Sequence, residues 1–257
     1  MNIIEISNLR KSFKVKKIKK EVLKGVNLTV KKGEVLCLLG SNGAGKTTMI
    51  NIMSTLLKQD SGKIIINGFD LNKSAEKVRQ SISLTGQFSA VDEILTGREN
   101  LELIARLTKV KSFKERSQEM LEKVDLIEVA DKAVFTYSGG MKRRIDIAMS
   151  LITTPSIIFL DEPTTGLDPV ARQEIYRLIK ELSEIGITFF LTTQYLEEAE
   201  KLADKIAILH DGSIIAYGSF ADLKKLIPAK KTIMVEQEVS LEEIYLNITM
   251  QKEKEEW

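Results

Sequence analysis

The chain has 257 residues, of which 43% are hydrophobic and 29% are charged, and its formal net charge is +2. This length suits one large domain with or without a small subdomain, and the composition is ordinary for a soluble globular protein. The near-neutral charge gives no reason to expect a nucleic-acid partner, and no run approaches the roughly 20 apolar residues of a membrane span. Residues 1–7 lack a signal-peptide pattern and the single cysteine, Cys37, excludes an internal disulfide, so we expect a cytosolic location.

Apolar runs and turn residues divide the chain into strands and helices. We expect strands over residues 3–7, 22–30, 35–39, 63–66, 82–84, 157–160 and 187–191, and a hairpin around Asp211-Gly212 that joins strands over 205–210 and 213–217. The run from Val35 to Leu39 is fully apolar, as expected of a central parallel strand that is buried on both faces. Helices are expected over 47–57 and from the capping pair Asp168-Pro169 to a stop at Gly186.

The stretch from Arg98 to about Leu151 has helical patterning and no strand signal. It interrupts the alternation of strands and helices, which otherwise predicts a mostly parallel α/β core. We therefore expect residues 1–90 and 153–218 to form one α/β core, residues 91–152 to form an inserted helical subdomain, and residues 219–257 to form a C-terminal tail. That tail begins with a short helix and ends in a charged run over 252–256.

Six lysines fall within residues 11–20, between the first two expected strands. One interpretation is a solvated hairpin loop. The other is a contact with anionic lipid near a membrane partner. Both interpretations stay open.

A glycine-rich loop follows the central strand and fits the pattern G-x-x-x-x-G-K-[ST] from Gly40 to Thr47. Its glycines allow backbone N–H groups to converge on phosphate oxygens, and the following helix adds the positive end of its dipole. Lys46 should reach the β- and γ-phosphates of a nucleotide, and Thr47 should bind Mg²⁺ through its hydroxyl. The loop residues expected to hold the phosphates are Ser41, Asn42, Gly43, Ala44, Gly45, Lys46, Thr47 and Thr48.

Two carboxylates, Asp161 and Glu162, follow the buried strand over 157–160. Asp161 would hold Mg²⁺ through water, and Glu162 could polarise an attacking water as a general base. The pair matters only if this strand lies beside the phosphate loop, which we expect.

The sequence Ser138-Gly139-Gly140 opens a helical stretch. By itself this is a capping motif, although N–H groups and a hydroxyl at a helix start also form an anion site. Together with the loop and the carboxylate pair, the motif resembles the nucleotide-binding subunit of an ATP-binding-cassette (ABC) transporter over about residues 3–220. The resemblance implies a P-loop NTPase core of the RecA type, with an antiparallel β subdomain and an inserted α-helical subdomain.

The resemblance also implies roles for several residues. Ser138, Gly139 and Gly140 of one subunit would cover the γ-phosphate held by a second nucleotide-binding subunit, for which we expect a homodimer. Gln87 would contact Mg²⁺ and sense the membrane partner. Asp168, in Gly166-Leu167-Asp168, would lie in the D-loop as well as capping its helix. Phe13 either stacks on adenine or belongs to the core.

Longer strings are similar to the daunorubicin-resistance type of exporter ATPase: 85–93, 95–101, 137–144 and 191–199. The tail over Ser240 to Leu246 resembles the C-terminal segment of that type. Met141 stands where many ABC proteins have glutamine, and Gln194 stands where most have a switch histidine, although glutamine is usual in this subgroup. Gln194 would therefore act with Glu162 and Lys46 in catalysis.

This resemblance implies an ATPase that uses ATP and Mg²⁺ and exports a drug, peptide or lipid. A separate transmembrane permease subunit would hold it at the cytoplasmic face of the membrane. The alternatives are a non-transport ABC ATPase and a module that senses ATP without hydrolysing it.

Overall fold

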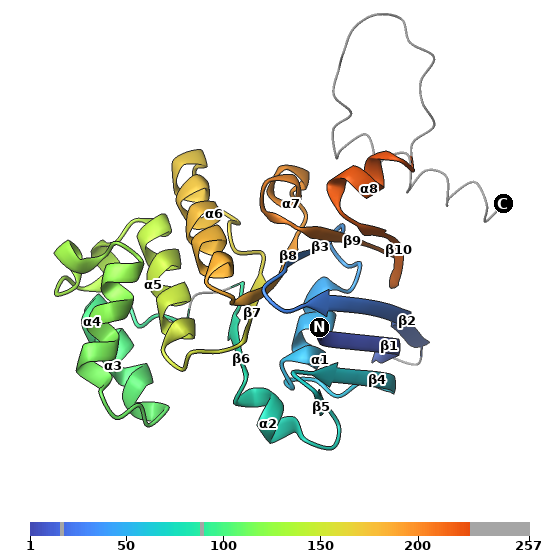
Figure 1. The fold of residues 1–257 in the computed structure, drawn as a ribbon, viewed down its shortest axis with the longest axis horizontal. Helices are drawn as coiled ribbons and strands as arrows, with labels where there is room; N and C mark the ends of the chain where they lie inside the picture. Colours follow the sequence, from blue (N-terminus) through green and yellow to red (C-terminus); the bar gives the residue numbers. More distant parts are fainter. Residues whose placement is uncertain (16–17, 88–89, 227–257) are drawn as a thin grey trace, which may run out of the picture.

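The computed structural model describes residues 1–15, 18–87 and 90–226 (Figure 1). The tail string over 240–246 and the charged run over 252–256 lie outside the described residues. The chain forms two sheets, with helices on the larger one and a group of helices at the far end from the N-terminus (Figure 1).

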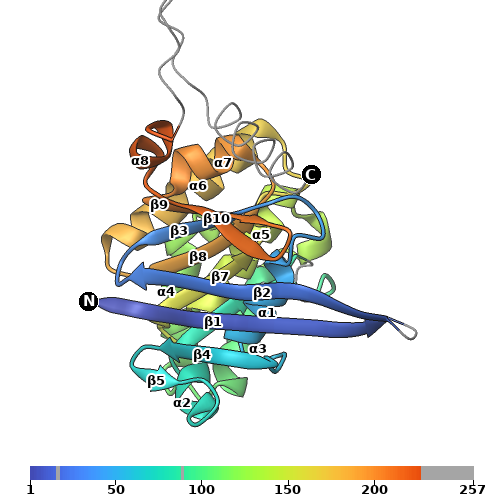
Figure 2. The ribbon, with the colours of Figure 1, turned by 90° about the vertical axis from the view of Figure 1, so that its right-hand side faces the viewer.

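The smaller sheet is antiparallel, in the order β2-β1-β4-β5. Its strands are β1 (Asn2–Val15), β2 (Ile18–Lys31), β4 (Ser61–Ile66) and β5 (Phe69–Asp70). Figure 2 shows β1 and β2 running side by side across this face and reaching past β4. Alternate residues of β2, namely Val26, Leu28 and Val30, are buried, which gives the strand one apolar face and one solvated face.

The lysine-rich segment is not a loop over most of its length. Antiparallel pairing continues from Lys11 opposite Leu23 to Val15 opposite Ile18, so β1 and β2 extend into it. Lys14, Lys19 and Lys20 are exposed on the strands, where charged side chains do not disturb the ladder. Lys11 instead bonds Asp60 at 3.1 Å. The loop interpretation is therefore wrong for residues 11–15 and 18–20.

The larger sheet has the order β10-β9-β3-β8-β7-β6, and all its pairings are parallel except that of β9 with the edge strand β10. The strands are β3 (Val35–Leu39), β6 (Ile82–Thr85), β7 (Ile157–Asp161), β8 (Thr188–Thr193), β9 (Lys205–His210) and β10 (Ser213–Gly218). All residues of β3, β7 and β8 are buried. Strand β8 pairs with both β3 and β7 and lies between them, so the phosphate-loop strand and the strand that precedes Glu162 are not direct neighbours in the sheet.

The two faces of the larger sheet build two separate cores. Leu36 and Leu38 of β3 pack with α1 (Lys46–Met53) and the antiparallel sheet, whereas Val35, Cys37 and Leu39 pack on the opposite side. That opposite side is covered by α6 (Pro169–Glu184), α7 (Leu196–Leu202) and the helical group. Two further short helices are α2 (Ala75–Arg79) and α8 (Phe220–Lys224).

The helical group consists of α3 (Gly97–Leu107), α4 (Phe113–Lys123) and α5 (Gly139–Leu151), with short 3-10 turns at Ile127–Val129 and Val134–Thr136. A capping box of Thr96 and Glu99 starts α3. Gly97 is required where α3 passes Tyr137, because a Cβ there would lie 2.4 Å from the tyrosine hydroxyl oxygen. An α/β core, an antiparallel sheet and a helical insertion confirm the expected fold class. Among the described helices, none has the length and apolar character to cross a bilayer.

Candidate functional site

Four parallel strands of the larger sheet end at the same edge, and the candidate residues follow them. The phosphate loop follows β3, Gln87 lies two residues after β6, Glu162 follows β7, and Gln194 follows β8. Ligands of open α/β sheets bind outside the carboxyl ends of the strands. Parallel pairing therefore gathers residues from four separate parts of the chain.

The phosphate loop is fixed at both ends. The Gly40 N–H donates to the carbonyl of Thr193 at 3.2 Å, which ties the start of the loop to the end of β8. Gly45, just before α1, has a φ of 112°, and a Cβ there would lie 2.9 Å from Leu23 Cδ2. Glycine is the residue that adopts this conformation without strain. The loop therefore leads directly into α1, and its last backbone N–H groups lie at the N-terminus of that helix.

A hollow of about 500 Å³ opens over this loop. Its volume is in the range of small-molecule sites. Its lining is polar and combines the loop with residues from distant parts of the chain: Val22, Asn42, Gly43, Gly45, Lys46, Thr47, Thr48, Gln87 and Glu162.

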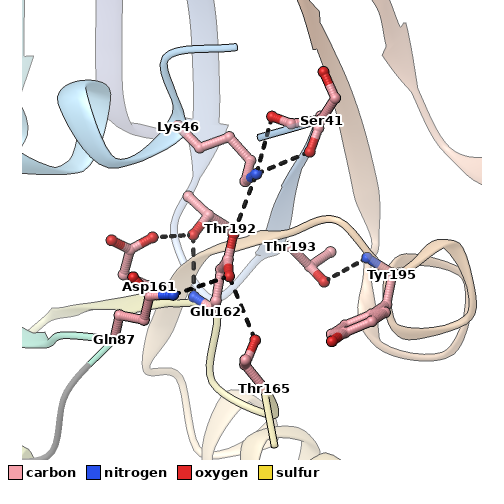
Figure 3. Close-up of polar contacts among 10 residues, drawn as sticks. Ser41, Lys46, Gln87, Asp161, Glu162, Thr165, Thr192, Thr193 and Tyr195 are labelled. Atoms are coloured by element: carbon pink, nitrogen blue, oxygen red, sulfur yellow. Dashed lines mark hydrogen bonds and ion pairs between the residues drawn. The ribbon is translucent and has the colours of Figure 1, made fainter. Parts of the chain in front are cut away.

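The Lys46 side chain is almost completely buried and points back across the loop (Figure 3). Its ammonium donates to the carbonyl oxygens of Gly40 at 2.9 Å and Ser41 at 3.2 Å. It also lies 3.2 Å from Glu162 Oε1. The lysine therefore joins the phosphate loop to the carboxylate after β7, although β8 lies between their strands.

Glu162 has a positive φ of 49°, a conformation that non-glycine residues rarely adopt outside special sites. Its N–H donates to the carbonyl and hydroxyl oxygens of Thr192, both at 3.1 Å. Its Oε2 receives hydrogen bonds from Gln87 Nε2 at 3.5 Å and from the Thr165 hydroxyl at 3.4 Å (Figure 3). The carboxylate is held at the hollow and could accept a proton from a water there.

Asp161 is buried and accepts a hydrogen bond from the Thr192 hydroxyl. Mg²⁺ is proposed to bind the Asp161 carboxylate, the Thr47 hydroxyl and the Gln87 amide. Thr47 and Gln87 line the hollow. These are hard oxygen donors, and Mg²⁺ binds with one or two carboxylates together with phosphate oxygens. The described residues contain no cluster of three histidine, cysteine, aspartate or glutamate side chains that could hold a metal alone. The donor set therefore fits Mg²⁺ bound together with a phosphate ligand.

Gln194 does not line the hollow over the phosphate loop. It is half-buried and lines a second hollow of about 270 Å³ together with Leu39, Gly40, Ser41, Asn42 and Leu196. The structure thus places Gln194 at the start of the loop, and Asn42 lines both this hollow and the one over Lys46.

The Ser-Gly-Gly motif does not join this group within the chain. Ser138 caps α5, where its hydroxyl accepts from Met141 N at 3.2 Å, and Ser138 and Gly139 are exposed. Asp168 is also exposed and caps α6 by accepting from the N–H groups of Val170 and Ala171. Neither motif lines the hollow over the phosphate loop.

Phe13 lies on β1 with 37% of its surface exposed and with the Lys11 ammonium 5.4 Å from its ring centre. This exposure excludes the core alternative. Stacking on adenine stays a proposal.

Sequence reasoning missed two contributors to the site. Val22 lines the hollow from β2, and Thr192 joins Asp161 to the backbone of Glu162. A valine in a strand carries no distinguishing signal. Thr192 belongs to the polar end of β8, two residues before Gln194, and this polar end was the signal that could have identified it.

Comparisons with known proteins agree with this geometry. Residues 23–165 match the family described as ABC transporter. The Daunorubicin resistance ATP-binding protein DrrA3 of Streptomyces coeruleorubidus is 49% identical over 207 residues, which are 80% of this chain and 66% of that protein. The chain thus spans slightly under two thirds of the length of the first curated relatives that it matches.

Two solved structures share the fold over nearly their whole length. An ATP-binding subunit of an ABC transporter has a TM-score of 0.80 at 28% identity, over 96% of this chain and 99% of that one. A dimeric ATP-binding cassette, described as a post-hydrolysis state bound to ADP and Pi, has a TM-score of 0.75 at 30% identity, over 84% of this chain and 98% of that one.

Proposed function

Because this chain belongs to the ABC transporter family, we propose that it binds and hydrolyses ATP and thereby powers export through a separate membrane subunit. The observation that carries the proposal is the ion pair of Lys46 with Glu162, because it brings the phosphate loop and a candidate general base to one hollow. In this proposal residues 1–90 and 153–218 bind the nucleotide, residues 91–152 carry the Ser-Gly-Gly motif, and residues 219–257 form the tail.

ATP binding is proposed to use three features of the hollow. The N–H groups of the loop and the start of α1 would bind phosphate oxygens, as helix N-termini do. Lys46 would exchange its contact with Glu162 for the β- and γ-phosphates, since both groups compete for the same ammonium. The adenine would extend from the Val22 side of the hollow toward Phe13.

Hydrolysis is proposed to use Glu162 as the base. The hydrogen bonds from Gln87 and Thr165 orient its carboxylate, and its N–H is anchored on Thr192. Thr47, Gln87 and Asp161 would hold Mg²⁺, which supplies charge stabilisation at the transferred phosphoryl group. Gln194, at the start of the loop, would donate a hydrogen bond to the γ-phosphate.

A second copy of the chain is proposed to complete the site. Ser138 and Gly139 are exposed and do not line the hollow of their own chain, which supports a role toward a partner. The similar cassette bound to ADP and Pi is a dimer. A two-fold arrangement of one chain type would make two equivalent sites.

Export through a permease at the cytoplasmic face of the membrane is proposed from the relatives. The daunorubicin and doxorubicin resistance ATP-binding proteins are 46–49% identical to this chain, and a linearmycin resistance ATP-binding protein is 40% identical. The favoured cargo is accordingly a drug-like compound, peptide or lipid. The non-transport alternative is not favoured, because these relatives are named as drug-resistance ATP-binding proteins. The ATP-sensing alternative is not favoured, because the candidate base Glu162 lines the hollow.

The decisive experiment combines two measurements. The purified chain is mixed with ATP and Mg²⁺, and phosphate release is followed with and without EDTA. A tagged chain is also purified from membranes of its host, and the proteins bound to it are identified. Mg²⁺-dependent phosphate release together with a co-purifying multi-spanning membrane protein is expected. Absence of phosphate release would contradict the ATPase proposal, and absence of a membrane partner would contradict export.

A further inference from the structure

Arg143 is a buried arginine in the first turns of α5, the helix that Ser138 caps. Only 8% of its side chain is exposed, and Asp146, one turn later, is buried with it at 3.2 Å. Burying an ion pair is costly unless its remaining hydrogen-bonding groups are also satisfied. The other hydrogen bonds of Arg143 therefore help to explain why it can be buried at this position.

Those contacts lie on two other elements of the site. Arg143 Nη1 donates to the carbonyl of Gly86 at 2.9 Å, and Gly86 directly precedes Gln87. Arg143 Nη2 donates to the carbonyl of Asp161 at 3.5 Å, and Asp161 directly precedes Glu162. One guanidinium thus joins the helix of Ser138 to the backbone beside Gln87 and beside Glu162.

A planar guanidinium can make these contacts together because its donors point in fixed, divergent directions. A lysine at the same place would keep the charge opposite Asp146 but could not hold both carbonyl groups in the same geometry. Burial lowers the pKa of Arg143, and the nearby carboxylates of Asp146, Glu198 and Asp161 oppose that shift.

We propose that Arg143 is a positioning residue that sets Gln87 and Glu162 relative to the helix that begins at Ser138. It does not line the hollow, so it acts through the carbonyl groups of Gly86 and Asp161. This inference rests on the proposed ATPase function for its kinetic consequence, but its structural part is independent of hydrolysis.

The chain contains a matched control at the opposite end of α5. Arg116 donates to the carbonyl groups of Leu151 at 2.6 Å and Ile152 at 3.2 Å, and it pairs with Glu119 three residues later. It therefore has the same kinds of partners as Arg143 and joins α4 to the end of α5, but it contacts none of the candidate site residues. Arg143→Lys and Arg116→Lys make the same chemical change at the two ends of one helix.

The first readout is kinetic. Arg143→Lys should lower kcat by ~10-fold or more with KM for ATP within ~3-fold, while Arg116→Lys leaves both within ~2-fold. The second readout is the distance between spin labels at Phe135→Cys, next to the Ser138 segment, and Glu200→Cys on α7, since both positions are exposed and Cys37 is buried. The distribution of distances between the two labels should broaden in Arg143→Lys and stay narrow in Arg116→Lys.

Equal effects of the two lysine substitutions on kcat, or an unchanged distance distribution in Arg143→Lys, would overturn the proposal. If Arg143→Lys does not fold, Arg143→Met with Asp146→Asn removes the buried charges together and is measured in the same way. If the unsubstituted chain releases no phosphate, the proposed function fails, and the distance measurement alone decides the role of Arg143.

Discussion

The Lys46 ammonium and the Glu162 carboxylate are 3.2 Å apart, although they follow strands that are separated by β8. Only 4% of the lysine side chain and 10% of the glutamate side chain are exposed. Each group therefore compensates the charge of the other in a buried position. Both groups are also proposed to act on ATP. Substitutions of this pair should therefore have one effect on the free energy of unfolding and a second, distinct effect on ATP binding or hydrolysis.

Lys46→Ala should weaken ATP binding by about 2–4 kcal/mol, because charge-assisted contacts with the β- and γ-phosphates are lost. It should also lower the free energy of unfolding by about 3–5 kcal/mol, because Glu162 stays buried without its partner. Calorimetry measures the first effect and denaturant unfolding the second. Combining Lys46→Ala with Glu162→Gln should recover part of the stability but not the affinity. Unchanged ATP affinity in Lys46→Ala would refute the phosphate-loop assignment.

Glu162→Gln keeps the shape of the side chain and its hydrogen bonds from Gln87 and Thr165. It cannot accept a proton, so the variant should bind ATP, stall before hydrolysis and accumulate as a closed dimer. Phosphate release and size-exclusion chromatography with ATP measure the two effects. Turnover at the unsubstituted rate would show that Glu162 is not the base.

The candidate site motifs could be located in the sequence because each depends on local chemistry. A loop with glycines at fixed spacing, an Asp-Glu pair after an apolar strand and a serine before two glycines are visible in short windows. The order of the strands was not visible, because apolar runs of similar length do not specify their neighbours. The structure places β8 between β3 and β7, an order that these apolar runs alone do not give.

Two further differences have the same kind of cause. Lysines suggested a loop over 11–20, but a strand with one solvated face accepts them, and pairing with β2 decides the outcome. Arg143 follows Lys142 and precedes Arg144 in a basic run. Nothing local distinguishes the one that is buried against Gly86 and Asp161, since that depends on contacts across the fold.

Ser138→Arg should prevent dimer closure and leave ATP binding to the single chain intact, because Ser138 is exposed and outside the hollow of its own chain. The test mixes equal amounts of Ser138→Arg and Lys46→Ala chains. If Ser138 acts on the partner, each mixed dimer keeps one intact site, and about a quarter of all sites should occlude ATP. If both residues serve the same chain's site, every site carries a defect and no occlusion should be seen.

Glu198→Gln tests a buried carboxylate on α7 that accepts a hydrogen bond from the Thr164 hydroxyl at 2.8 Å. Burial raises the pKa of Glu198 above its ordinary value of 4.5, against the opposing effects of Thr193, Thr164 and Arg143. Below that ordinary value the carboxyl is protonated in both states, so burial carries no charge penalty. The penalty grows as the pH rises through the higher pKa of the folded state.

By linkage, the free energy of unfolding of Glu198→Gln relative to that of the parent should therefore increase from pH 5 to pH 8. Denaturant unfolding at each pH measures this difference. The neighbouring Glu197 provides a control without this pH dependence. Lys201 lowers the pKa of Glu197, so its ionised form stabilises the fold above the ordinary value of 4.5 and loses that effect only at lower pH. The stability of Glu197→Gln relative to the parent should therefore stay nearly constant from pH 5 to pH 8. The same trend in both variants would contradict the assignment for Glu198.

Gln194→Ala tests the residue that stands in place of a switch histidine. Thr193, just before it, is bonded through its carbonyl to Gly40 N, so the backbone holds Gln194 against the start of the loop. A glutamine amide can donate to a phosphate but cannot take up a proton, unlike imidazole with its pKa of about 6.5. We expect Gln194→Ala to lower turnover at least ~10-fold, or ~1.4 kcal/mol of barrier, with little change in ATP affinity. Gln194→His should retain activity and acquire a pH dependence between about 6 and 7. Parental turnover in Gln194→Ala would show that another residue contacts the γ-phosphate.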